Sequence, residues 1–141
     1  MAFVLSPGVA PRRFSVSVSP QKNTRFVLAN ARQPARMSVQ EKAIEKGGGM
    51  KVIKAADENV IAELGCRSWD KWGCEPSTFD WTYSDDEICL VLEGDFTVKP
   101  ADGSDSMDVQ AGDIAFFPKG MSCVWEVRKA VDKHFLFGKS L

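Results

Sequence analysis

Residues 112–123 read GDIAFFPKGMSC, and this stretch decides the fold of the chain. Apolar residues fill positions 114–117, and glycine-bearing turns flank them, Gln110-Ala111-Gly112 before and Pro118-Lys119-Gly120 after. A short apolar run bounded by turns is typical of a buried β-strand, so we predict a strand over residues 113–117.

The same pattern of short strands and glycine-bearing connectors extends over residues 50–141. Further connectors are predicted at residues 93–95 and 101–104, and the one helical turn falls near residues 57–64. Many short strands at regular spacing indicate an all-β sandwich, jelly roll or small barrel. The predicted strands cover residues 51–54, 66–69, 79–83, 87–92, 96–99, 106–109, 113–117, 122–127 and 133–137.

Residues 112–123 also resemble the second conserved motif of the cupin superfamily, G-x5-P-x-G-x2-H-x3-N. Both glycines and the proline are in register, Cys123 takes the place of the histidine and Val127 that of the asparagine. Upstream, Glu87 followed after six residues by Gly94 resembles the end of the first motif, H-x-H-x3,4-E-x6-G. The resemblance implies a cupin double-stranded β-helix, which is a jelly-roll barrel.

Three further stretches, residues 69–74, 79–83 and 133–135, are similar to the ureidoglycine aminohydrolase-type cupins. The similarity is closest to small plant members of that family with transit peptides, one of which is named for the plastid transcriptionally active chromosome. A shared fold does not determine a shared activity, so this resemblance says little about chemistry.

The metal site that the cupin resemblance implies has lost most of its ligands. Such a site uses three imidazoles and one carboxylate, and only Glu87 remains, because Trp81, Tyr83 and Cys123 stand at the histidine places. We therefore expect neither a metal nor another cofactor. The four cysteines match no zinc-finger spacing and are expected as free thiols (Cys66, Cys74, Cys89 and Cys123).

The alternation of side chains along strands predicts what lines the barrel mouth instead. If Glu87 points inward, Cys89 and Val91 do too, and the same period of two brings Trp125 inward with Cys123. Phe135 and Phe137 are expected on the core face, with Lys133 on the same side near the rim. A buried carboxylate needs a partner, for which Lys133, Tyr83 and Ser122 are the candidates. The predicted ligand-binding residues are Trp81, Tyr83, Glu87, Cys123, Trp125 and Lys133, with packing as the alternative role for the aromatic and thiol side chains.

Charge is distributed unevenly along the chain. Residues 1–40 hold six basic residues and no acidic one, whereas residues 41–141 hold 12 basic and 19 acidic residues, a net charge of −7. The first segment has the composition of an organellar transit peptide, and a basic tail on a cytosolic protein is the alternative. We expect a disordered chloroplast transit peptide at 1–37, a flexible leader at 38–49 and the cupin domain at 50–141. The acidic domain argues against direct nucleic-acid binding, and no segment predicts a membrane span.

The loss of the metal ligands and the charge of the first segment predict an accessory protein of the plastid stroma or nucleoid, without a catalytic residue. The resemblance to the small plant cupins implies the plastid transcription complex, which contains the plastid-encoded RNA polymerase, as its expected partner. An exposed cluster of Trp69, Trp72, Cys74 and Pro76 is the predicted protein interface. One alternative is a metal-independent enzyme in which Glu87 or Tyr83 acts as base and Lys133 stabilises negative charge. Another is a sensor whose Trp81 and Trp125 rings hold a small molecule. The oligomeric state stays open, with a homodimer among the alternatives.

Overall fold

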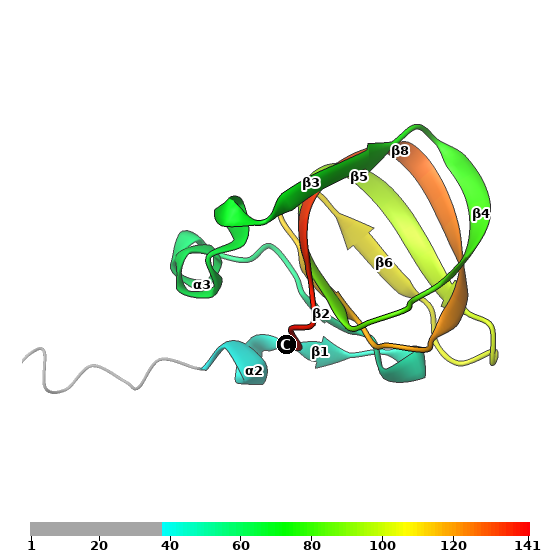
Figure 1. Ribbon diagram of the computed structural model, residues 1–141, viewed down its shortest axis with the longest axis horizontal. Coiled ribbons are helices and arrows are strands. Elements are labelled where there is room, and N and C mark those ends of the chain that lie inside the picture. Colours follow the sequence, from blue (N-terminus) through cyan, green and yellow to red (C-terminus); the bar gives the residue numbers. More distant parts are fainter. Residues whose placement is uncertain (1–37) are drawn as a thin grey trace, which may run out of the picture. The chain divides into compact units, whose positions relative to one another are not determined.

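The computed structural model describes residues 38–141, so the predicted transit peptide at residues 1–37 lies outside the described residues. One antiparallel sheet curls into a barrel, with two short helices beside it (Figure 1). The strands follow the order β1-β2-β7-β5-β8-β3, with β4 paired to β8 and β6 paired to β5. This architecture confirms the predicted all-β cupin barrel. The strands are β1 (Ile44–Glu45), β2 (Lys51–Ile53), β3 (Asp70–Cys74), β4 (Ser77–Thr82), β5 (Glu87–Pro100), β6 (Met107–Gln110), β7 (Ile114–Phe117) and β8 (Ser122–Phe137).

Two long strands, β5 and β8, replace four of the shorter strands that the sequence predicts. They pair with each other from Glu87 opposite Phe137 to Pro100 opposite Cys123. Residues 93–95, predicted as a turn, instead form an irregular stretch inside β5, where the register shifts relative to β8. Gly94 allows this shift because its φ of 129° suits glycine, and a Cβ there would lie 3.0 Å from the Cα of Val131.

The irregular stretch changes which residues of β5 face the barrel interior. Before it, Cys89 and Val91 lie in the interior cluster, whereas after it Phe96 and Val98 do. The inward positions therefore change from odd to even numbers. A strand with an uninterrupted period of two could not place both pairs inside the barrel.

The segment between β2 and β4 differs from the sequence prediction in one place. Helix α3 (Glu58–Leu64) confirms the predicted helical turn, and the Asp57 side chain caps it by accepting a hydrogen bond from the Val60 N–H. Residues 66–69, predicted as a strand, form a short 3-10 helix, η3 (Cys66–Ser68), and the strand β3 follows it. Gly65 adopts the left-handed conformation that ends α3 and starts this second turn.

Residues 38–49 carry regular structure that differs from the flexible leader expected there. Helix α2 (Val39–Lys42) begins with a capping box between Ser38 and Glu41, and β1 pairs with β2. The glycine run forms the turn η2 (Gly47–Gly49), which packs closely enough that a Cβ on Gly47 would lie 2.3 Å from the backbone oxygen of Asp105. The three glycines therefore serve close packing. No helix among residues 38–141 has the length and apolar character needed to cross a lipid bilayer.

Apolar side chains form two clusters, one on each side of the β5 region of the sheet. The interior cluster fills the barrel and contains the rings of Tyr83, Phe96, Phe117 and Trp125. The outer cluster lies against helices α2 and α3 and contains, from β5 and β7, Ile88, Leu90, Ile114 and Phe116. The sheet is therefore covered on its outer face here, while its inner face lines the barrel.

The aspartate of the GDIAFF stretch joins separate parts of the fold. Asp113 accepts hydrogen bonds from the Ala55 N–H at 2.9 Å and the Gln110 N–H at 2.8 Å, and it forms an ion pair with Lys54. Its side chain is only 3% exposed. Hydrogen bonds to a buried carboxylate are stronger than those between neutral groups, so Asp113 stabilises the approach of the β2–α3 loop to the β6–β7 turn.

We expect Asp113→Asn to lower the free energy of unfolding by about 2–4 kcal/mol in urea denaturation followed by circular dichroism. The amide keeps the size of the carboxyl group but has one acceptor oxygen for two N–H donors. Asp132→Asn is the matched control, because Asp132 pairs with Lys71 on the surface, and its loss should stay below about 1 kcal/mol. Equal losses in the two variants would contradict this role for Asp113.

Candidate functional site

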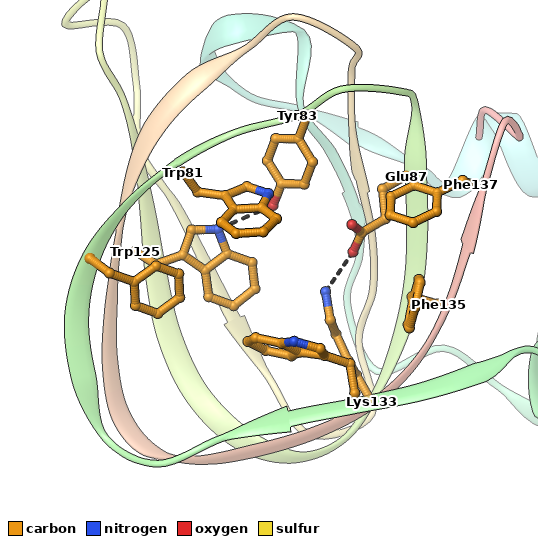
Figure 2. Close-up of a pocket in the computed structure, with 9 residues that line it drawn as sticks. Trp81, Tyr83, Glu87, Trp125, Lys133, Phe135 and Phe137 are labelled. Atoms are coloured by element: carbon orange, nitrogen blue, oxygen red, sulfur yellow. Dashed lines mark hydrogen bonds and ion pairs between the residues drawn. The ribbon is translucent and has the colours of Figure 1, made fainter.

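The barrel contains a cavity of about 170 Å³ whose walls are mostly aromatic (Figure 2). Its wall has two charged side chains, Glu87 and Lys133. Trp81 and Phe137 are about half exposed and stand at the rim, whereas Glu87 and Lys133 are only 4% exposed and lie deeper. The aromatic lining residues are Trp72 from β3, Phe79 and Trp81 from β4, Tyr83 just after β4, and Trp125, Phe135 and Phe137 from β8.

The alternation of strand residues brings these side chains to one side of the sheet. Phe79 and Trp81 are two residues apart on β4, and Tyr83 continues the period. On β8 the same period carries Lys133, Phe135 and Phe137 toward the cavity. Phe79 is paired with Trp125 across β4 and β8, and their rings stack with centroids 5.8 Å apart.

A buried ion pair crosses the cavity wall. The Lys133 ammonium lies 2.5 Å from Oε2 of Glu87, and both side chains are about 5% exposed. The same ammonium lies 5.0 Å from the ring centroid of Trp72 and 5.1 Å from that of Trp125. Carboxylate and aromatic faces together compensate its charge, which would otherwise be costly to bury. Of the three partners considered for Glu87, the structure places Lys133 against it.

Tyr83 presents a protonated hydroxyl group to the cavity. Its oxygen accepts a hydrogen bond from Trp125 Nε1 at 3.1 Å, and its ring stacks on Phe117. Burial raises the pKa of this hydroxyl well above its ordinary value, and the nearby negative charge of Glu87 raises it further. The group is therefore a hydrogen-bond donor at physiological pH, and the role of general base does not suit it.

Five of the six predicted site residues lie around this one cavity, namely Trp81, Tyr83, Glu87, Trp125 and Lys133. Cys123 packs in the interior cluster but does not line the cavity, and its thiol donates a hydrogen bond to the backbone oxygen of Trp81 at 3.5 Å. Burial raises the pKa of Cys123 to about 11, so the thiol stays protonated near neutral pH. Its inward direction was predicted, but the alternation of residues does not reveal whether a side chain reaches the cavity.

The sequence interpretation did not include Trp72 or Phe79 in the site. Trp72 is 36% exposed, in line with the exposed cluster predicted with Trp69, and its ring also contacts Trp125 edge-on at 5.9 Å and lines the cavity. Trp69 is 9% exposed and packs in the outer cluster. The two tryptophans therefore lie in different environments, and the exposed interface predicted from them is not present as one patch. Phe79 could have been found, because it is two residues before Trp81.

The residues at the implied metal site do not fit a divalent ion. Tyr83 and Cys123 keep their protons, and Trp81 has no lone pair to donate. Glu87 already binds the ammonium of Lys133, which would repel a second cation. Residues 38–141 contain no group of three or more His, Cys, Asp or Glu side chains that could hold a metal.

Comparisons of sequence and of structure both find cupin-type proteins similar to this chain. A family model described as the EutQ-like cupin domain matches residues 61–135. Two proteins named acetate kinase EutQ match over 74 residues, at 34% identity in Escherichia coli K12 and 40% in Salmonella typhimurium LT2. The match covers 52% of this chain and 29% of each relative, so the chain spans under a third of their length. A crystal structure of a DUF861 family protein from Thermotoga maritima has a TM-score of 0.59 and 35% identity, over 62% of this chain and 98% of that one.

The Glu87–Lys133 pair can be tested with a double-mutant cycle. We expect Glu87→Gln and Lys133→Met each to lower the free energy of unfolding by about 3–5 kcal/mol, because each leaves one buried charge uncompensated. The double variant should lose less than the sum of the two by at least about 2 kcal/mol in chemical denaturation.

The exposed pair Lys99–Glu126, with atoms 2.7 Å apart, provides the matched control for this cycle. Its coupling energy should stay below about 1 kcal/mol, since water screens both groups. Additive losses at Glu87 and Lys133 would show that the two charges are not coupled in the folded protein.

Proposed function

This chain belongs to the EutQ-like cupin domain family, and within that family we propose that it binds a small molecule in its barrel without the help of a metal ion. The observation that carries the proposal is the cavity of about 170 Å³ with aromatic walls and a few polar groups that converge on it. Ligand sites in proteins commonly combine a mostly apolar lining with a small number of placed polar groups, and barrel mouths are a frequent location.

A binding role accounts for the cavity better than packing does. Close packing would leave few spaces larger than a water molecule, whereas this one opens at a rim formed by Trp81 and Phe137 and has room for a small molecule. Glu87, Lys133 and Tyr83 also place a few polar groups in an otherwise apolar wall, which is the composition that ligand sites commonly have. A molecule held between the rings would use both the space and the polar groups.

The site residues support binding more than catalysis. In the enzyme alternative, Glu87 or Tyr83 acts as base and Lys133 stabilises negative charge. In the structure Glu87 and Lys133 form an ion pair with each other, and Tyr83 keeps its proton, so none of the three is free for that role. The relatives named acetate kinase match this chain over only 29% of their length, so the proposal does not extend their activity to it. We propose a protein without a catalytic residue.

We expect one molecule of a single-ring aromatic compound, such as toluene or benzamide, to bind per protein chain with heat release in titration calorimetry. Phe137→Ala should weaken this binding about fivefold or more, since Phe137 lines the cavity rim and aromatic contacts of this kind contribute about 1 kcal/mol. Leu136→Ala is the matched control: Leu136 is the neighbouring residue, is also exposed and does not line the cavity, so affinity should not change. Absence of saturable binding by every such compound would refute the proposal.

A second candidate function is an accessory role in the plastid, as the resemblance to small plant cupins of the ureidoglycine aminohydrolase type implies. Six basic residues and no acidic one before Glu41 support targeting to the plastid stroma or nucleoid. The net charge of −7 over residues 41–141 favours a protein partner, such as the plastid transcription complex, over nucleic acid. Exposed rings at the cavity rim, Trp81 and Phe137, offer apolar surface for such a contact. The two functions are compatible.

The targeting proposal predicts the behaviour of a reporter fusion. Residues 1–50 joined to a fluorescent protein should direct it into chloroplasts, where the fusion should become shorter on an immunoblot. A variant in which the six arginine and lysine residues before Glu41 are changed to glutamine is the control and should lose import. A full-length, evenly cytosolic reporter would contradict the proposal.

A further inference from the structure

We propose that the cavity selects uncharged, flat carbonyl compounds of about single-ring size, which accept a hydrogen bond from Tyr83 between aromatic walls. The inference rests on the proposed binding function and adds the chemical class of the ligand. Three properties of the cavity lead to it: its volume and walls, its charge, and a buried hydroxyl donor in its wall.

The volume and the walls define the size and shape of the ligand. A cavity of about 150 Å³ in a protein core holds benzene, so about 170 Å³ accommodates one ring and a small substituent. Phe79 stacks nearly parallel to Trp125 at 19°, and Trp81 stands edge-on to Tyr83 at 77°. Such surfaces make their best contacts with flat apolar faces.

The two charged side chains of the wall neutralise each other, and this determines the charge of the ligand. Glu87 and Lys133 are 2.5 Å apart and nearly inaccessible to water, so the cavity wall carries no net charge. A carboxylate ligand would compete with Glu87 for the single ammonium, and a cationic ligand would compete with Lys133 for the single carboxylate. Either would lose its own hydration without an unpaired countercharge in return. An uncharged ligand avoids this cost.

Tyr83 supplies a hydroxyl group that can donate a hydrogen bond to the ligand. The residue is 2% exposed, its oxygen accepts from Trp125 Nε1, and the hydrogen bonds within residues 38–141 include no acceptor for its O–H. Figure 2 shows this hydroxyl directed toward the Trp125 indole, at the wall of the cavity. A buried donor without an acceptor is unfavourable, and a ligand carbonyl oxygen would satisfy it. The raised pKa of this group keeps the donor hydrogen in place.

Four probes of similar shape separate these properties in titration calorimetry at pH 7: benzamide, benzoate, benzamidinium and toluene. With the wild-type protein we expect benzamide to bind at least about fivefold more tightly than the anion and the cation, and about fivefold more tightly than toluene, the latter being the effect of roughly one hydrogen bond. Tighter binding of benzoate or benzamidinium would overturn the inference on charge, and equal binding of toluene would overturn the role of Tyr83. In those cases the proposed binding function would stand. If none of the four bound, the proposed function itself would fail.

Variants test the same groups one at a time. Tyr83→Phe should weaken benzamide about fivefold and leave toluene unchanged within about twofold, because the variant removes the hydroxyl group and keeps the ring. Glu87→Gln leaves the Lys133 charge uncompensated and should shift the ratio of benzoate to benzamide affinity toward benzoate by at least about tenfold. Lys133→Met should shift the ratio of benzamidinium to benzamide affinity toward benzamidinium. Leu136→Ala should change neither of these two affinity ratios. Unchanged ratios in folded variants would overturn the inference; the wild-type series decides it even if the variants fail to fold.

Discussion

The antiparallel pairing of β5 with β8 is the interaction on which the rest of the structure depends. These two strands supply the charged pair of the cavity and, through Trp125, the ring at its centre. Strands β3 and β4 both join the sheet through β8, and β6 and β7 both join it through β5. Each wall of the cavity is therefore positioned relative to this one ladder. Because the ladder joins the long strands along most of their length, it also gives the barrel a rigid frame.

An ammonium group binds the carboxylate that the resemblance to metal-binding cupins implies as a metal ligand. Lys133 binds the one remaining carboxylate, Glu87, and the rings of Trp72 and Trp125 lie about 5 Å from its ammonium group. The substitution changes what the barrel can do. A metal activates water or polarises a bound group, whereas an ion pair between aromatic walls provides an electrically neutral compartment with a mostly apolar lining.

The fold could be predicted largely because residues 112–123 contain a motif whose turns and buried strand depend on local chemistry. The irregular stretch of β5 could not, since a glycine with positive φ serves a turn and a bulge equally well. For the site, the register of the motif selected Tyr83 and Glu87 and the period of two selected Trp125 and Lys133, and all four line the cavity. Neither could choose Lys133 as the partner of Glu87, or separate Trp72 from Trp69, because both outcomes depend on distances between strands far apart in the sequence.

At the irregular stretch around Gly94, the inward-facing positions of β5 change from odd to even residue numbers. Odd positions face inward near Glu87 and even positions face inward near Phe96, so no straight strand could serve both halves. A side chain at position 94 would meet the backbone of Val131, although Gly94 itself does not line the cavity. The side chains that face inward on both sides of Gly94 thus depend on the absence of a Cβ at this one position. A mutation of Gly94 would therefore alter the cavity by changing the register between β5 and β8, at a distance from the lining residues themselves.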